Sequence, residues 1–178
     1  MHTRHTPDSP ASKDRPAVKS IVINGLAIAL VFVAAAFIHI RIPMAGTGGM
    51  IHLGDLPLFI FALLYGRRTG MFAGALGLTL FDLLSGWTLW APFSFVIGGS
   101  IGWTVGAVAE QNAGDKRYLY WLSILAANAV TIGGYYITEA VLYGNWLAPA
   151  GSVPLNFLQV TVAGLLAFPL AKRLKKTR

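Results

Sequence analysis

Three acidic residues are placed where they could bind a ligand, because each lies within or beside a strongly apolar stretch: Asp55, Asp82 and Glu139. A carboxylate at the centre of a bilayer-spanning helix costs about 2.5–3.5 kcal/mol on insertion scales. Such residues therefore occupy helix ends or protected cavities, and they are functional candidates. Two of them have a structural alternative. Gly54-Asp55-Leu56-Pro57 is typical of a helix N-cap with proline in the first turn, and Asp82 could simply accept hydrogen bonds from helix ends or loops.

Aromatic rings and amides gather in the segments next to these acids. The rings are Trp87, Trp90, Tyr135, Tyr136, Tyr143 and Trp146, and the amides are Asn145, Asn156 and Gln159. Aromatic faces with a few convergent polar groups are typical of a small-molecule pocket, here one for a planar heterocycle with hydroxyl or amino substituents. An interfacial aromatic belt is the alternative explanation for part of these rings.

Metal and covalent chemistry have little support in the sequence. His39 and His52 flank the segment 41–53 without a third ligand nearby, so we expect backbone hydrogen bonds there, with His52 as an additional ligand contact. The chain has no cysteine and no phosphate-loop, H-E-x-x-H or G-x-S-x-G motif. We therefore expect no enzyme, metal or cofactor; a membrane enzyme acting on lipid through Asp82 and Glu139 would lack a nucleophile.

The composition predicts that membrane helices position these groups. Of 178 residues, 55% are hydrophobic and only 12% are charged, and the mean hydropathy is +0.61, whereas soluble domains are about 25% charged. Apolar runs of about 20 residues are typical of transmembrane helices. We predict an all-α integral membrane protein, a single bundle of six transmembrane helices at about 21–40, 54–66, 70–86, 91–109, 118–142 and 154–171.

The segments outside this membrane domain, residues 21–172, are polar. Residues 1–20 are rich in proline and serine and are predicted to be a disordered tail, and residues 173–178 a basic tail. The apolar run from Ile21 to Ile40 is longer than the hydrophobic region of a signal peptide, so it is interpreted as a retained helix.

The basic residues set the predicted orientation. With both termini in the cytosol, all 14 lysines and arginines except Arg41 fall on the inner side. The positive charge is thus explained by topology and gives no reason to expect nucleic-acid binding. In this orientation Asp55, Asp82 and Glu139 share one outer layer, with Asp82 and Glu139 roughly 5–6 Å below the outer ends of their helices.

Small residues recur at a spacing of four in three of the predicted helices. The ridges are Gly25 and Ala29, Gly70 and Gly74, and Gly98, Gly102 and Gly106. Such ridges allow helices to approach closely in lipid. We expect them to pack the bundle internally, while the ridge on the first helix could instead dock a partner membrane protein.

The segment from Met50 to Gly99 resembles the substrate-binding S components of energy-coupling factor (ECF) vitamin transporters. The resemblance lies in the H-x-G-D turn at His52–Asp55, the basic turn at Arg67-Arg68, and F-D-L-L-S-G before W-A-P-F; farther on, Y-Y-I-T-E…Y-G-N…P-x-N-x-x-Q also fits. It covers nearly all of residues 20–172. Among the branches of the family, the chain is most similar to those for hydroxymethylpyrimidine or pyridoxine, and less to riboflavin-type members.

The resemblance implies a capture protein of the bacterial plasma membrane. Such a protein binds a vitamin at the outer face and associates with a transmembrane coupling protein that carries two ATPase subunits, which hydrolyse the ATP. The implied ligand-binding residues are Asp82, Trp87, Trp90, Tyr136, Glu139, Asn145, Asn156 and Gln159, with His52 as a weaker addition.

The family's coupling contact is an A-x-x-x-A pattern on the first helix. The nearest matches here are Gly25 with Ala29, or Ala27 with Val31. Riboflavin, thiamine and pantothenate stay open as ligands. A different class of protein also stays open, a membrane assembly protein whose acids only cap helices.

Overall fold

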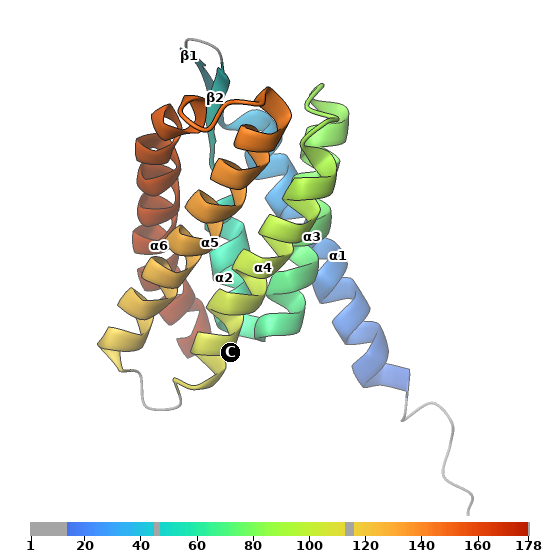
Figure 1. Ribbon diagram of the computed structural model, residues 1–178. Helices are drawn as coiled ribbons and strands as arrows, with labels where there is room; N and C mark the ends of the chain where they lie inside the picture. Colours follow the sequence, from blue (N-terminus) through green and yellow to red (C-terminus); the bar gives the residue numbers. More distant parts are fainter. Residues whose placement is uncertain (1–13, 45–46, 113–115, 178) are drawn as a thin grey trace, which may run out of the picture.

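The computed structural model describes residues 14–44, 47–112 and 116–177. Within them the chain forms six α-helices, one β-hairpin and a short 3-10 helix (Figure 1). In chain order the elements are α1 (Asp14–Phe37), β1 (His39–Met44), β2 (Thr47–His52), α2 (Asp55–Tyr65), α3 (Arg67–Leu84), α4 (Ala91–Glu110), α5 (Arg117–Tyr143), η2 (Ala148–Gly151) and α6 (Val153–Lys176).

The hairpin is the main departure from the predicted all-α fold. We expected residues 41–53 to be a linker, but β1 and β2 pair antiparallel there, with His39 opposite His52. The β-branched Ile40, Ile42 and Ile51 favour strands, although no turn motif in the sequence marked them as a pair. The hairpin stands at one end of the bundle, and both ends of the described chain lie toward the other (Figure 1).

Helix boundaries also differ from the prediction. α1 begins at Asp14, so the last seven residues of the predicted disordered tail are helical, and residues 1–13 lie outside the described part. α6 runs to Lys176 and takes in most of the predicted basic tail. The predicted linker 66–69 shrinks to Gly66, whose φ of +85° lets α2 and α3 reverse direction in one residue.

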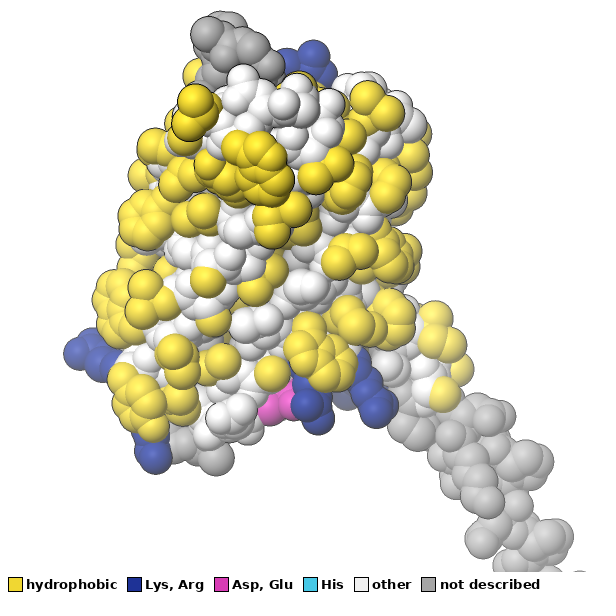
Figure 2. Space-filling view, viewed as in Figure 1, with side chains coloured by type: hydrophobic (Ala, Val, Ile, Leu, Met, Phe, Trp, Pro, Cys, Tyr) yellow, Lys and Arg dark blue, Asp and Glu magenta, His cyan; other side chains and the backbone are white. Residues whose placement is uncertain are grey.

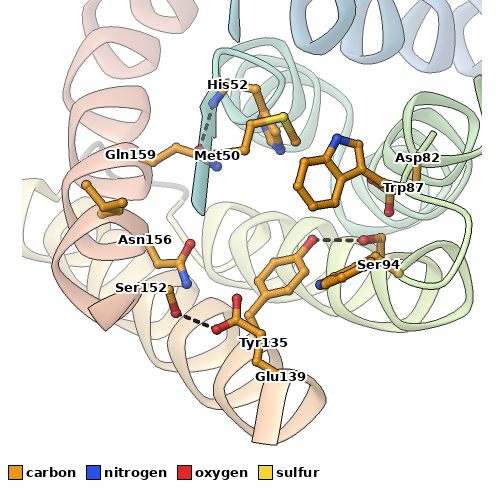
Figure 3. A pocket seen from close by; sticks show the side chains of 12 residues that line it. Met50, His52, Asp82, Trp87, Ser94, Tyr135, Glu139, Ser152, Asn156 and Gln159 are labelled. Atoms are coloured by element: carbon orange, nitrogen blue, oxygen red, sulfur yellow. Dashed lines mark hydrogen bonds between the residues drawn. The ribbon is translucent and has the colours of Figure 1, made fainter. Parts of the chain in front are cut away.

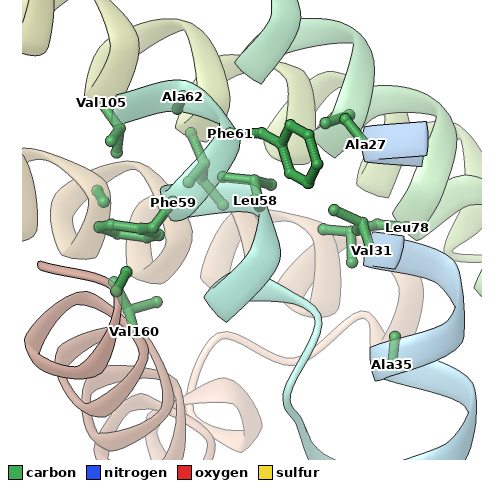
Figure 4. Packing of buried hydrophobic residues seen from close by; sticks show 14 of the residues in the cluster. Ala27, Val31, Ala35, Leu58, Phe59, Phe61, Ala62, Leu78, Val105 and Val160 are labelled. Carbon is green, nitrogen blue, oxygen red and sulfur yellow. The ribbon is translucent and has the colours of Figure 1, made fainter. Parts of the chain in front are cut away.

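Helix α2 occupies the centre of the bundle. Its Leu58 and Ala62 are fully buried and Phe59 is 1% exposed. Figure 4 shows these side chains between Val31 of α1 and Val160 of α6, both also fully buried. A helix that is apolar all round must be covered on every side, which accounts for its central place despite its short length.

Helices α3 and α4 pack through glycines in what we call the α3–α4 seam (Gly70, Gly74, Gly98 and Gly102). A methyl group on Gly98 would lie 2.6 Å from the carbonyl oxygen of Gly74 and 3.0 Å from Leu78 Cδ1. Glycine is thus required because the two backbones touch. The prediction that these small residues pack the bundle internally is confirmed.

The flank of the bundle is apolar. Figure 2 shows hydrophobic side chains over most of the visible flank, with most lysine and arginine side chains at the end opposite the hairpin. By length and hydropathy, three described helices could cross a membrane: α1 over Ala17–Phe37, α4 and α6. Helices α3 and α5 also expose large apolar side chains, such as Leu84 at 72% and Val141 at 62%.

Candidate ligand-binding site

A polar cavity opens at the hairpin end of the bundle, and we refer to it as the outer cavity. It has a volume of about 60 Å³ and is formed by β2, α3, α4, α5, α6 and their connections. Its lining residues are Met50, His52, Asp82, Trp87, Trp90, Ser94, Tyr135, Glu139, Ser152, Leu155, Asn156 and Gln159. Figure 3 shows Gln159 and Asn156 on one side of the cavity, Trp87, Asp82 and Ser94 on the other, and Glu139 between them.

The fold brings together most of the residues predicted from the sequence to bind ligand. Those that line the cavity are His52, Asp82, Trp87, Trp90, Glu139, Asn156 and Gln159. They lie as far as 107 positions apart in the chain, yet surround one small volume. They are neighbours because α3, α4, α5 and α6 pack against one another in turn and α6 packs against β2.

Tyr136 and Asn145 do not line the cavity. The Tyr136 hydroxyl donates to the backbone oxygen of Trp146 at 2.6 Å, and Asn145 Oδ1 accepts from the N–H of Leu147 at 2.8 Å. Both residues shape the connection after α5. Helical periodicity accounts for the first correction, because the cavity face of α5 that carries Glu139 carries Tyr135 one turn earlier, leaving Tyr136 on another face.

Five lining residues were not predicted as ligand contacts: Met50, Ser94, Tyr135, Ser152 and Leu155. The i, i+4 spacing of Tyr135 and Glu139 was the available signal for one of them. Ser94 and Tyr135 join α4 to α5 through a hydrogen bond between their hydroxyls, 3.0 Å long. Ser152 donates to Glu139 Oε2 at 2.9 Å and so orients that carboxyl.

Several buried polar atoms around the cavity have no hydrogen-bond partner among the described residues. They are Asp82 Oδ2, Trp87 Nε1 and His52 Nδ1. A buried polar atom without a partner costs about 1–3 kcal/mol, so native proteins keep few of them away from functional sites. Trp87 Nε1 can only donate, whereas the Asp82 carboxylate can only accept. The cavity thus offers both kinds of hydrogen bond to a polar ligand.

Asp55 is not the N-cap that the local sequence suggested. The N-cap of α2 is Gly54, without a side-chain hydrogen bond, and Asp55 is 2% exposed. Its Oδ2 instead accepts a hydrogen bond of 2.6 Å from Gln159 Nε2 on α6. The cap interpretation is wrong because the Asp55 carboxylate accepts its hydrogen bond from a residue 104 positions away and not from the first turn of α2.

His52 sits at the junction between the hairpin and the cavity. Burial lowers the pKa of its imidazole, and the nearby Asp55 carboxylate opposes this shift only in part. The ring is therefore neutral at pH 7 and packs edge-on against Phe81, with centroids 5.5 Å apart. His39 has its Nδ1 2.9 Å from the backbone oxygen of Ala36, as expected from the sequence.

Aromatic rings and one arginine border the cavity on the α3–α4 side. Trp87 and Trp90 pack edge to face at 5.2 Å. Arg41 of β1 lies 5.6 Å from the centroid of Trp87 and donates to the backbone oxygen of Ser85 at 3.2 Å. Arg41 thus links the hairpin to the loop between α3 and α4.

The coupling candidates on α1 fall on different faces of the helix. Gly25 and Ala29 are exposed, and no atom lies within 4 Å of where a Gly25 side chain would be. Ala27 is fully buried in the core with Val31. Ala27 and Val31 are therefore corrected from partner contacts to core residues, while Gly25 and Ala29 keep an open surface.

Comparison with known proteins gives one family and several relatives. The model of the family "ECF-type riboflavin transporter, S component" matches residues 16–176. The chain is 29% identical to the thiamine precursor transporter HmpT of Lactococcus lactis subsp. cremoris, over 92% of each chain. It is 33% identical to an uncharacterized protein of Pyrococcus woesei, over 71% of this chain and 82% of that one.

A solved structure shares the fold. The S component of a bacterial ECF transporter superposes with a TM-score of 0.69 at 19% identity, over 90% of this chain and 98% of that chain. The matched family and HmpT are transporter proteins and not enzymes. The chain therefore belongs to the S component family of ECF-type transporters and is a membrane component for vitamin or vitamin-precursor uptake.

Proposed function

We propose that this S component captures a one-ring vitamin precursor, hydroxymethylpyrimidine, in the outer cavity. The observation that carries the proposal is the combination of small volume and two-sided polar lining in that cavity. The similarity to a thiamine precursor transporter over 92% of both chains supports the same ligand. Pyridoxine, a single ring of similar size, is the second candidate.

The volume separates the candidate ligands. A cavity needs about 10–15 Å³ to hold one water molecule, so a cavity of about 60 Å³ has room for a small ligand. That is the room of one substituted six-membered ring. The fused three-ring system of riboflavin would require the hairpin or α6 to move, which makes riboflavin a weaker candidate although the family model carries its name.

The lining supplies contacts for a substituted pyrimidine. The faces of Trp87 and Trp90 can stack on the ring. The carboxyls of Asp82 and Glu139 can accept from an amino or hydroxyl group, and Trp87 Nε1 can donate to a ring nitrogen. Asn156, Gln159 and His52 complete the proposed contact set on the remaining side.

The proposed orientation places the hairpin outside and both termini in the cytosol of a bacterium, with six helices in the plasma membrane. Arg67, Arg68 and Arg117 start helices at the end opposite the hairpin, and α6 ends there with Lys175 and Lys176. This asymmetry supports cytosolic termini through the positive-inside rule. Helix α2 has only 11 residues and is too short to cross the membrane alone. We propose that the hairpin and the connections next to its outer end fill the remaining thickness.

Coupling to transport is proposed to use the exposed face of α1. Gly25 and Ala29 provide a smooth strip next to Leu26, which is 53% exposed. Figure 1 shows the first half of α1 slanting away from the other helices, and Gly25 and Ala29 are both exposed among the described residues. We propose that a transmembrane coupling protein packs there, and that its two ATPase subunits supply the energy.

Ligand identification tests the proposal. The protein is purified in detergent and denatured, and the released small molecules are identified by mass spectrometry. Titration calorimetry then covers hydroxymethylpyrimidine, pyridoxine, thiamine, riboflavin and pantothenate. A stoichiometric one-ring ligand that binds more tightly than riboflavin is the expected result.

Two outcomes would contradict the proposal. Tighter binding of riboflavin would keep the capture role but overturn the one-ring ligand. An empty protein that binds no member of the panel would favour the alternative class, a membrane assembly protein. In that case Glu139→Gln should leave association with partner proteins unchanged.

A further inference from the structure

We infer that the His52–Asp55 turn is a clamp that fixes the side-chain amide of Gln159, so that Gln159 presents an N–H donor to a ligand acceptor. The inference rests on the proposed function of the outer cavity. It gives the H-x-G-D motif a task in ligand selection. It also makes Asp55 a positioning residue, since Asp55 itself does not line the cavity.

Both ends of the turn hold the same amide. The backbone N–H of His52 donates to Gln159 Oε1 at 2.8 Å, and Gln159 Nε2 donates to Asp55 Oδ2 at 2.6 Å. Asp55 is 2% exposed and Gln159 is 9% exposed, so little water competes for these bonds. The four-residue turn from His52 to Asp55, which precedes α2, thus binds the Gln159 side chain of α6 at both of its polar atoms.

The chemistry of the two partners leaves only one orientation for the amide. A backbone N–H can only donate, so it must face the oxygen, and a carboxylate can only accept, so it must face the nitrogen. The flipped amide would place donor against donor and acceptor against acceptor. Since the nitrogen carries two hydrogens and Asp55 takes one, a single N–H is left for the cavity that Gln159 lines (Figure 3).

The turn itself is packed for this geometry. A methyl group on Gly54 would lie 3.0 Å from Ala35 Cβ and 3.3 Å from His52 Nδ1. Any larger residue would push the turn away from α1 and shift both ends of the clamp. The glycine of the motif is therefore explained by close packing, since its φ of −59° is open to any residue.

The two sides of the cavity then select a ligand by opposite rules. Gln159 requires an acceptor such as a ring nitrogen or hydroxyl oxygen. Across the cavity, Asp82 Oδ2 has no partner within residues 14–44, 47–112 and 116–177 and accepts from a donor such as an amino group. A ring that carries an acceptor on one edge and a donor on the opposite edge satisfies both. A ring with donors on both edges is rejected at Gln159.

The test compares hydroxymethylpyrimidine with analogues that each lack one ring nitrogen or the hydroxyl, by titration calorimetry. In the wild-type protein, one analogue should bind about ten-fold more weakly than the parent, because the Gln159 N–H is left unpaired. Asp55→Ala should weaken the parent about ten-fold and reduce this discrimination to about two-fold. Asp55→Asn retains an acceptor at the same place and should keep the discrimination.

A swapped pair is the sharpest variant and covers the case in which Asp55→Ala does not fold. In the double variant Asp55→Asn with Gln159→Glu, the new amide donates to one carboxylate oxygen, and the other oxygen still accepts from the His52 N–H. The group facing the cavity is now an acceptor. We expect the protein to fold and to lose or reverse its preference for the acceptor-bearing parent.

The outcomes separate this inference from the function on which it rests. Equal discrimination in wild type, Asp55→Ala and the swapped pair overturns the clamp and assigns Asp55 a structural role only. Wild-type affinity that is the same for the parent and every analogue also overturns it. A wild-type protein that binds no member of the ligand panel contradicts the proposed function itself, and the clamp inference falls with it.

Discussion

The α3–α4 seam and the outer cavity show two opposite ways of using a helix contact. In the seam, Gly74 and Gly98 bring two backbones together so closely that no methyl group fits. In the cavity, the same α3 carries Asp82, and one buried oxygen of this side chain has no hydrogen-bond partner in the part of the chain that the structure describes. One helix is therefore packed tightly along one face and left unsatisfied near its outer end.

The difference indicates where stability and function reside. Close backbone packing contributes dispersion contacts that any added atom would disrupt. Unpartnered polar atoms cost folding energy and are repaid only when a ligand binds. Substitutions in the seam should hence act mainly on folding, and substitutions in the cavity mainly on binding.

Gly98→Leu should have the largest effect. The new side chain would meet the Gly74 carbonyl and cannot be relieved by a rotamer change, because the obstacle is backbone. Overpacking typically costs about 1–3 kcal/mol and more where nothing can shift, so we expect loss of monodisperse protein in detergent size-exclusion chromatography. Gly133→Ala is the matched control, since no atom lies within 4 Å of its added methyl group. A monodisperse Gly98→Leu protein would show that the seam is not tightly packed.

Glu139→Gln should weaken ligand binding about 10- to 100-fold, the range for losing a hydrogen bond to a charged group. The thermal midpoint without ligand should change little, because a glutamine oxygen can still accept from Ser152. Trp90→Ala is expected to weaken binding similarly through lost stacking. Tyr136→Phe is the control and should bind as wild type, since that hydroxyl bonds the Trp146 backbone outside the cavity. Wild-type affinity in both cavity variants would contradict the site assignment.

Acidification should destabilise the protein through His52. Burial lowers its pKa in the folded protein, so the unfolded chain binds the proton first as pH falls below about 6.5. Folding stability is full above that pH and is lost progressively below it, by at most about 1.4 kcal/mol at pH 5.5. Thermal melts of wild type and His52→Gln between pH 7.5 and 5.5 measure this difference. Parallel loss in both proteins would place the pH dependence elsewhere.

Arg41→Ala should have the smallest effect on stability, within about 1 kcal/mol, because its contacts with Ser85 and Trp87 are exposed. These contacts hold the hairpin against the α3–α4 connection, so the ligand should dissociate a few-fold faster. Stopped-flow displacement measures the rate. Arg41→Lys keeps the charge, so its ligand dissociation rate should lie between those of the wild type and Arg41→Ala. An unchanged dissociation rate would show that the hydrogen bond between His52 of β2 and Gln159 holds the hairpin in place without Arg41.

Much of the site followed from the sequence because membrane insertion is governed by local composition. Apolar runs and the positions of lysine and arginine predicted the helices and one shared layer for Asp82 and Glu139. The predicted helix ends agree with the structure within three residues except at the start of α1 and the end of α6, and the two acids line one cavity. Because burying a charge in an apolar run is costly, these two acids could be identified as functional candidates without any knowledge of the fold.

The contacts that position the site were decided by tertiary structure. The sequence around Asp55 is typical of a helix cap, yet its carboxylate bonds Gln159, 104 positions away. Tyr135 rather than Tyr136 faces the cavity because of how α5 is rotated against its neighbours, and Ala27 rather than Gly25 is buried by the side of α1 that meets the core. The β-hairpin also depends on the pairing of two strands, which no turn motif in the sequence predicted. Periodicity predicts that a helix has faces, but only the packing of one helix against another decides which face meets the ligand, the core or the lipid.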